Sequence, residues 1–352
     1  MPGAGRAAGR SRTFETGNVK GASLPGLAVL NPNGRDPDLP YQQGTGLPDP
    51  SVHAPVNYHA YAACTGGGFY RTPKLAARHR NVLLLLRGDL TEARKAFDLL
   101  KSQGCFVAIA FKEAGTHQVA AQLQRHRALL RFQTLAAEAE LCLSSTPELV
   151  TLYQSVSSRV AEIPTPYPVD VPGWDFARPP HQRAGVFIGT REFDVPTRNH
   201  LVVLSAARGL ATRLTVVAGA KDVPILAALQ LGPERIHAVR PLPYPAYLRL
   251  MATHRLVLQF DQSCVPGQVA GDALLCGLPA VGGHGAVERL ILPELNGYGR
   301  DFRTLLEFVH RLLGDDKFYH GQVQTMKALA GERLSFQAIR RQLETCFPGL
   351  GG

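Results

Sequence analysis

The chain has 352 residues, of which 45% are hydrophobic and 19% are charged. Its composition is globular and its length allows two α/β domains, which excludes a disordered or fibrous chain. The longest purely aliphatic run, Val82–Leu86, is far too short to span a membrane. No apolar stretch follows the N-terminal arginines, so we expect no secretory signal. The expected location is cytoplasmic, with a peripheral contact to the inner face of the membrane as an open alternative.

The formal net charge is +10, which suggests an anionic partner. Basic residues are spread along the chain, however, and the one dense cluster is Arg78-His79-Arg80. Zinc-finger spacing and aromatic RNA-binding signatures are both absent from the sequence, so we expect no nucleic-acid partner. Steeply salt-dependent binding to any DNA or RNA would restore that alternative. Small anions such as nucleotide diphosphates, or an anionic membrane surface, account for the charge equally well.

The six cysteines are far apart in the sequence and include no C-x-x-C pair. Several lie in apolar surroundings, as Cys105 does between Gly104 and Phe106. We therefore expect buried, reduced thiols in place of a disulfide framework or a zinc site.

The N-terminal half begins with an expected flexible tail, residues 1–24, and continues with a proline-rich stretch to residue 56. A short strand is possible at residues 28–32 and another at 58–63. A clear β-α-β pattern follows, because apolar runs at 81–86 and 106–110 flank an amphipathic helix at 90–103. Residues 119–138 are expected to be helical, with a strand at 141–143 and a helix that opens at Thr146. This pattern predicts a doubly wound N-terminal domain over residues 25–165.

Prolines mark the expected domain boundary. Six of them lie between Ile163 and Pro180, and we assign residues 166–182 to a linker. The second half repeats the alternation of strands and helices, which predicts another doubly wound domain over residues 183–335 and a C-terminal helix and tail over 336–352. Its expected strands are at 185–189, 214–219, 236–239, 256–260 and 278–283. Ligands bind beyond the carboxyl ends of such strands, so we expect a site in the crevice between the domains.

The most informative segment extends from Gln259 to Glu288. Within it, residues 269–275 are expected to form a short helix whose N-terminal amides can face an anion, with Asp272 in its opening turns. Gly282 and Gly283 permit a close approach of backbone to a ligand. His284 follows them directly.

Asp272-Ala-Leu-Leu-Cys-Gly-Leu-Pro-Ala-Val281 resembles the donor-binding signature of GT-B glycosyltransferases of the group 1, or family 4, type. In that family an E-A-M-A-x-G-x-P-V-V sequence follows an earlier Glu and a seven-residue spacer. The resemblance puts Asp272 where the family's second Glu binds the nucleotide ribose. The first Glu falls on Cys264, and Asp261 is the nearest carboxylate that could replace it.

A second match lies at the first strand of the C-terminal half. The family has strand-G-R-x-x-x-x-K-G-helix there, and its Arg and Lys contact the donor diphosphate. The corresponding residues in this sequence are Gly189, Thr190, Arg191 and Arg198. The family often presents a His from an N-terminal-domain loop to the sugar or acceptor, and His117 follows the strand at 106–110.

The resemblance implies two Rossmann-like domains that face a central cleft, and the transfer of a sugar from a nucleotide-diphosphate sugar to a hydroxyl acceptor. It further implies metal-independent, retaining chemistry without a cofactor, in a setting such as polysaccharide synthesis. The implied catalytic residues are His117 and Asp261. The implied donor-binding residues are Gly189, Thr190, Arg191, Arg198, Asp272, Gly282, Gly283 and His284.

Plain structural roles stay open for these residues. Asp272 can be a carboxylate favoured by a helix dipole, and Arg191 and Arg198 can be surface residues. Glu288 can pair with a neighbour one turn away on a solvated helix. For the whole protein, a nucleotide-sugar epimerase of the same fold and a catalytically degenerate sugar-nucleotide-binding or scaffold protein are the alternatives.

Overall fold

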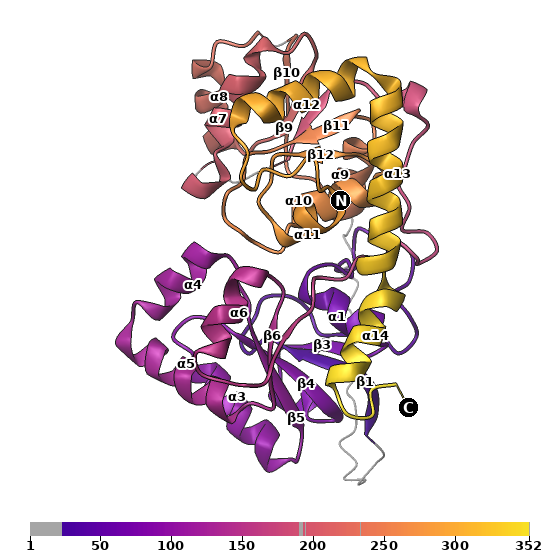
Figure 1. The fold of residues 1–352 in the computed structure, drawn as a ribbon. Coiled ribbons are helices and arrows are strands. Elements are labelled where there is room, and N and C mark those ends of the chain that lie inside the picture. The colour runs from indigo at the N-terminus through magenta and orange to yellow at the C-terminus, as the bar shows by residue number, and fades with distance from the viewer. Residues whose placement is uncertain (1–22, 190–192, 194, 233, 352) are drawn as a thin grey trace, which may run out of the picture.

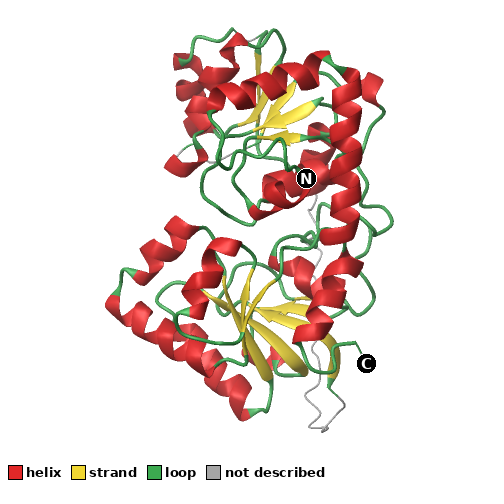
Figure 2. Ribbon diagram, in the orientation of Figure 1, coloured by secondary structure: helices red, strands yellow, loops and turns green. Residues whose placement is uncertain are grey.

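The computed structural model describes residues 23–189, 193, 195–232 and 234–351; the predicted tail, Thr190 and Arg191 lie largely or wholly outside these ranges. Two separate sheets organise the chain, one in each half, and almost all of their strands are parallel (Figures 1 and 2). This arrangement confirms the predicted pair of doubly wound domains. Among the described residues, no helix is long and apolar enough to cross a membrane.

The first sheet has the strand order β2-β3-β1-β4-β5-β6-β7, and only β2 is antiparallel to its neighbour. Its central strands read as continuous apolar runs because both of their faces are covered. The strands are β1 (Leu24–Leu30), β2 (Leu39–Pro40), β3 (Gly68–Tyr70), β4 (His79–Leu86), β5 (Phe106–Phe111), β6 (Leu141–Ser144) and β7 (Val160–Glu162).

Alternate residues of β4 point into two different cores. Leu84 and Leu86 pack with helices α3 (Thr91–Ser102), α5 (His126–Glu138) and α6 (Pro147–Gln154). Leu83 and Leu85 pack with residues of α1 (Tyr58–Cys64) and α14 (Phe336–Cys346) on the opposite face. The period of two along a strand thus explains how one apolar run supplies both layers. Two further helices, α2 (Pro73–Ala76) and α4 (Thr116–Leu123), complete this half.

The second sheet is entirely parallel in the order β10-β9-β8-β11-β12. Its strands are β8 (Val186–Ile188), β9 (Leu214–Val217), β10 (Ile236–Val239), β11 (Leu256–Leu258) and β12 (Ala280–Val281). The helices of this half are α7 (His200–Ala206), α8 (Val223–Ala228), α9 (Tyr244–Met251), α10 (Gln268–Leu275), α11 (Ala286–Ile291), α12 (Phe302–Gly314) and α13 (Asp316–Arg333).

The end of the chain returns to the first half, as Figure 1 shows for the yellow helices α13 and α14. Helix α13 packs on α11, whereas α14 packs on α1. The linker lies beside this crossing, where the Tyr167 amide donates to the Leu334 carbonyl (2.8 Å) and the Phe336 amide donates to Asp170 (3.0 Å). We propose the division at residues 166–182 on this basis, with α14 as a tie between the halves.

Three predicted elements differ in the structure. Residues 58–63, expected as a strand, belong to helix α1, in which every residue is buried. Burial on all sides removes the periodicity that separates a helix from a strand, and its alanines favour a helix. The helical stretch at 119–138 is divided into α4 and α5. The alternation of strands and helices also predicts a helix over 197–208, which begins only at His200 after a 3-10 turn.

The cysteines are free thiols, as predicted. Four are buried, whereas Cys264 and Cys346 are half-buried. Cys276 lies in the core of the second half, where burial raises the pKa of its thiol well above the usual value. Cys276 therefore serves packing, since a buried neutral thiol is a poor nucleophile.

Candidate functional site

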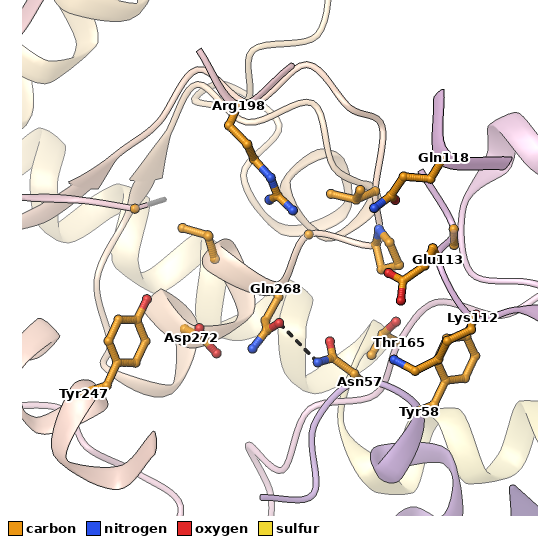
Figure 3. A pocket seen from close by; sticks show the side chains of 16 residues that line it. Asn57, Tyr58, Lys112, Glu113, Gln118, Thr165, Arg198, Tyr247, Gln268 and Asp272 are labelled. Atoms are coloured by element: carbon orange, nitrogen blue, oxygen red, sulfur yellow. Dashed lines mark hydrogen bonds between the residues drawn. The ribbon is translucent and has the colours of Figure 1, made fainter. Parts of the chain in front are cut away.

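A cavity of about 190 Å³ lies between the two halves of the molecule, and side chains from both point into it (Figure 3). The first half contributes Asn57, Tyr58, Lys112, Glu113, Ala114, Gln118 and Thr165. The second half contributes Gly189, Arg198, Tyr247, Val265, Pro266, Gly267, Gln268, Val269 and Asp272. We call these two sets the N-terminal wall and the C-terminal wall.

Strand ends position the cavity. Lys112 and Glu113 follow the last residue of β5, and Gly189 follows the last residue of β8. Ligands of parallel α/β sheets bind beyond the carboxyl ends of the strands. The predicted crevice is therefore the place where the structure has its cavity.

The N-terminus of helix α10 forms part of the C-terminal wall, because Gly267, Gln268 and Val269 all line the cavity. Gly267 caps the helix with φ of +99°, a backbone conformation that favours glycine. At Gly189 a side chain would lie 2.5 Å from Val269 Cγ1. Glycine at that position thus lets strand β8 and helix α10 approach closely. The first amides of a helix have no intrahelical acceptor, so this end can bind an anion.

Arg198 is the guanidinium of the C-terminal wall. Its Nη1 lies 2.6 Å from Asp261 Oδ2, and this ion pair is mostly buried. The other carboxylate oxygen of Asp261 accepts a hydrogen bond from the Ser263 amide (2.8 Å). Asp261 does not line the cavity and is only 4% exposed. It therefore lies behind Arg198, where it fixes the orientation of that side chain.

Asp272 reaches the cavity from the first turns of α10, although only 2% of the residue is exposed. Its Oδ1 accepts a hydrogen bond of 2.5 Å from the hydroxyl of Tyr244. Burial, together with the neighbouring Asp272 carboxylate, raises the pKa of Tyr244 well above its usual value. The tyrosine therefore stays a neutral donor, and it holds the carboxylate in a defined orientation beside the cavity.

The N-terminal wall carries polar groups on less buried side chains. Glu113 is exposed and Lys112 is half-buried, with its ammonium 5.9 Å from the centre of the Tyr58 ring. The Tyr58 hydroxyl donates to the Phe111 carbonyl (2.5 Å), which ties α1 to the end of β5. This wall thus offers one cation and one carboxylate from adjacent residues of a loop (Figure 3).

Two polar contacts connect the halves around the cavity. The Asn57 amide donates to Gln268 Oε1 (3.1 Å), the contact drawn as a dashed line in Figure 3. Arg289 forms a bidentate ion pair with Glu148, with nitrogen–oxygen distances of 2.6 and 3.0 Å. Asn57 has φ of 53° and ψ of −134°, which is strained for a residue with a side chain.

Three of the predicted site residues therefore line the cavity, namely Gly189, Arg198 and Asp272. His117 lies on α4 next to the lining residue Gln118 but does not line the cavity itself. Its Nδ1 is buried and lacks a hydrogen-bond partner. Thr190 and Arg191 fall outside the described residues.

Gly282, Gly283 and His284 follow β12 and do not line the cavity. A side chain at Gly282 would meet the Gln259 carbonyl at 2.2 Å, and one at Gly283 would meet Glu288. In the described structure these glycines accommodate neighbouring protein groups. The His284 amide donates to the Asp261 carbonyl (2.8 Å), and burial lowers the pKa of its imidazole.

The solvated-helix alternative for Glu288 is wrong, because the residue is only 2% exposed. Its Oε1 accepts from Gln259 Nε2 (2.8 Å), whereas Oε2 has no partner. Burial raises the pKa of this carboxyl to about 7. A side chain at Gly267, a cavity residue, would lie 2.1 Å from Glu288 Oε2, so the acid lies directly behind the C-terminal wall.

Sequence reasoning missed most of the N-terminal wall. Tyr58 begins a segment expected to be a strand and Asn57 was assigned to no element, so their convergence on the cavity could not be anticipated. The loop at 111–117 is the exception, because it follows a strand whose carboxyl end is expected at the crevice. Its residues Lys112 and Glu113 do line the cavity, although only His117 was singled out from this loop. Gln268 could have been found from its position directly before the helix predicted at 269–275 to face an anion.

No protein-family model and no curated protein match this sequence. Solved structures do share its fold. Sucrose-phosphate synthase (tll1590) from Thermosynechococcus elongatus superposes with a TM-score of 0.64 at 14% identity, over 92% of this chain and 98% of that one. Anabaena HepE in complex with UDP-glucose gives a TM-score of 0.59 at 16% identity, over 78% and 79%. S. aureus TarM, in a complex that includes UDP, gives 0.57 at 12% identity, over 77% and 56%. The predicted GT-B fold is therefore confirmed.

Proposed function

We propose that this protein is a glycosyltransferase that moves a sugar from a nucleotide-diphosphate sugar to a hydroxyl acceptor. The observation that carries the proposal is the interdomain cavity, whose C-terminal wall combines the N-terminus of α10 with the guanidinium of Arg198. Three structures of the same fold support it, since they are a sucrose-phosphate synthase, a protein bound to UDP-glucose and a protein bound to UDP. UDP-sugars are therefore the first donors to test.

The C-terminal wall suits the leaving group of such a reaction. When the glycosidic bond to the donor breaks, negative charge develops on the departing diphosphate. A guanidinium already oriented by Asp261 and a helix N-terminus can stabilise that charge without reorganisation. Because these groups can neutralise the diphosphate, we propose metal-independent transfer that uses no cofactor. The expected observation is a rate that does not change when Mg²⁺ or Mn²⁺ is added.

Asp272 suits the ribose of the nucleotide, as its resemblance to the family's second Glu implies. A carboxylate that is fixed by Tyr244 and reaches the cavity can accept hydrogen bonds from two neighbouring hydroxyls. Lys112 and Glu113, on the opposite wall, would then face the acceptor.

Retention of the donor's anomeric configuration is the stereochemical outcome that the resemblance implies. Under retention Glu113 only helps to bind the acceptor, so Glu113→Gln lowers kcat/KM for the acceptor by about tenfold. A loss of roughly a thousandfold in kcat, with an inverted product, would instead identify Glu113 as a general base. The measurement is the anomeric configuration of the product by NMR, together with steady-state kinetics of the variant.

A second candidate is a protein that binds a sugar nucleotide without turning it over. Cys264 favours it, because it occupies the place of an acid in the resembling family and lies outside the cavity lining. Asp261 does not replace that acid directly, since it pairs with Arg198 behind the wall. Donor binding without product, across a broad set of hydroxyl acceptors, would favour this candidate.

A thermal-shift screen of the full chain against nucleotides and nucleotide sugars tests the donor site. A ligand that binds only the folded state raises the midpoint of unfolding. We expect a shift with one diphosphate nucleotide and its sugar conjugates. The shift should be lost in Asp272→Ala and Arg198→Ala and kept in Arg303→Ala, a control arginine on α12 with an 88% exposed side chain. No shift with any nucleotide, in folded protein, would reject both the transferase and the binding protein.

A further inference from the structure

Three side chains outside the cavity lining have the spacing of metal ligands. Asp36 lies in the loop after β1, His53 lies in the segment before α1, and His59 lies within α1. One ligand atom from each can be chosen so that all three lie within 4.8 Å of one another. We call these residues the His–Asp cluster. None of the three lines the interdomain cavity.

His59 is the buried member of this cluster, and one of its ring nitrogens has no hydrogen-bond partner. The residue is only 2% exposed, and its ring is stacked between those of His53 and Phe69, with centroid distances of 3.9 and 3.6 Å. Its Nδ1 lies 3.0 Å from the Tyr41 hydroxyl, whereas Nε2 is buried and has no hydrogen-bond partner. An unsatisfied buried polar atom costs about 1–3 kcal/mol, so such an atom requires an explanation.

In both histidines a hydrogen bond of Nδ1 can leave the lone pair on Nε2, where it can bind a metal. His53 Nδ1 lies 2.9 Å from the Ala54 carbonyl, and because a carbonyl only accepts, this nitrogen carries the proton. In neutral His53 the lone pair is therefore on Nε2, which lies 4.0 Å from Asp36 Oδ1. For His59, a proton on Nδ1 that is donated to the Tyr41 oxygen leaves the lone pair on Nε2. Metal-bound histidines are typically held in this way by their other nitrogen.

We propose that the His–Asp cluster binds a divalent transition metal, with zinc as the expected ion, through His53 Nε2, His59 Nε2 and Asp36 Oδ1. Two imidazoles and one carboxylate suit Zn²⁺ better than Mg²⁺ or Ca²⁺, which prefer oxygen ligands. Tetrahedral coordination separates ligand atoms by roughly 3.4 Å, and each imidazole binds an ion in the plane of its ring. The partly exposed His53 ring must therefore turn out of its stack on His59 when the ion binds.

Access and a fourth position are both available. The side chains of His53 and Asp36 are 32% and 33% exposed, so an ion can enter from solvent and keep a water ligand. Bound there, the metal would fasten the long segment between β1 and α1 onto α1 itself. That helix is preceded by Asn57 and begins at Tyr58, both of which line the cavity. The ion is thus structural, and it leaves the proposed metal-free transfer chemistry unchanged.

The competing explanation is a simple ion pair between protonated His53 and Asp36, 4.0 Å apart. That pair needs no metal and leaves His59 Nε2 unsatisfied. It predicts that removing either residue changes stability equally in the presence and absence of zinc. The metal site predicts that removing His53 or Asp36 lowers the stability more in the presence of zinc than in its absence.

The experiment uses the full chain, without a histidine tag, stripped of metal by a chelator and then exchanged into zinc-free buffer. We expect about one Zn²⁺ per chain by mass spectrometry of the metal after equilibration with micromolar zinc. The midpoint of thermal unfolding should rise by about 3–10 °C. Co²⁺ should produce visible absorption bands of a low-symmetry site, which report the ligands independently of stability or activity.

The variants replace the two partly exposed ligands, because replacing the buried His59 risks misfolding. His53→Ala and Asp36→Asn should each lower zinc occupancy at least tenfold and abolish the cobalt bands. The control is His126→Ala, an exposed histidine at the start of α5, which should keep both. Equal zinc occupancy in the control and the cluster variants, or no occupancy in the unaltered chain at micromolar zinc, would overturn the proposal.

Discussion

The two walls of the cavity are built in different ways. The C-terminal wall is made of backbone and buried, paired side chains: the start of α10, Gly189, Asp272 held by Tyr244, and Arg198 held by Asp261. The N-terminal wall presents Lys112 and Glu113 from a loop, the first half-buried and the second exposed. Neither side chain forms a hydrogen bond or ion pair with another residue in the described part of the chain. One wall is preorganised, and the other can adapt.

This difference matches two chemical tasks. A group that must stabilise charge on a leaving diphosphate works best when it is already oriented, because reorganisation during the reaction costs free energy. A surface that must accept different hydroxyl compounds benefits from side chains that can move. The comparison therefore predicts that substitutions in the C-terminal wall affect the donor and those in the N-terminal wall affect the acceptor.

The largest effect is expected from Arg198. Arg198→Ala removes the guanidinium from the cavity and leaves Asp261 buried without its cation, so kcat/KM for the donor should fall by about 10²–10³-fold. Lys112→Ala should lower kcat/KM for the acceptor by only about tenfold, with little change in donor affinity. The two variants are compared by steady-state kinetics, with donor and acceptor varied in turn, and by calorimetry of donor binding.

Arg198→Lys is the sharper control, because it keeps the charge but not the planar contact with Asp261. If orientation matters, this variant should lose nearly as much activity as Arg198→Ala. A lysine variant close to the unaltered enzyme would mean that charge alone is sufficient and that the C-terminal wall is not preorganised. A larger donor effect from Lys112→Ala than from Arg198→Ala would reverse the assignment of the walls.

The next effect concerns Glu288, the acid behind the C-terminal wall. Burial raises the pKa of this carboxyl from the usual 4.5 to about 7. Between those two pH values the folded state keeps a proton that the unfolded state has released, so the free energy of unfolding falls as pH rises. Above pH 7 the folded protein bears a buried charge. Glu288→Gln removes this penalty, and the variant should be more stable than the unaltered chain at pH 8 by on the order of 2 kcal/mol.

The measurement is denaturant unfolding of both proteins at pH 5 and pH 8. At pH 5 the two stabilities should nearly coincide, because the carboxyl is then protonated in the fold. Glu307→Gln, on the exposed face of α12, is the matched control and should alter stability little at either pH. A Glu288→Gln variant that is equally destabilised at both pH values would show that the ionised carboxylate is required for folding.

The same contrast between the walls explains which parts of the site could be predicted from the sequence alone. The alternation of apolar runs predicts both sheets, and a local motif at residues 272–281 predicts Asp272 at the C-terminal wall. That wall is recognisable because helix, glycine and acid are neighbours in the sequence. The N-terminal wall combines Asn57, Lys112 and Thr165, which only tertiary packing brings together. Asp261 was recognised as a carboxylate of interest, but its position behind Arg198 depends on side-chain geometry that no spacing encodes.

The smallest expected effect concerns the hydrogen bond that joins the walls, from Asn57 to Gln268. Asn57 has φ of 53° and ψ of −134°, which glycine adopts more readily than alanine. Asn57→Ala and Asn57→Gly both remove the bond, yet only alanine keeps the strain. The alanine variant should therefore be less stable than the glycine variant by about 1 kcal/mol. Gln268→Ala removes the bond from the other wall and should cost about 0.5–1 kcal/mol.

A double-mutant cycle with Asn57→Gly and Gln268→Ala separates the two contributions, with stability measured by denaturant unfolding. If the bond couples the walls, the second substitution should have less effect once the first is present. Strictly additive losses would mean that the walls are joined without this contact, by α14 and by the ion pair of Arg289 with Glu148. Equal stabilities for the glycine and alanine variants would show that the backbone at Asn57 is relaxed, and the N-terminal wall would then be as free to adapt there as it is at Lys112 and Glu113.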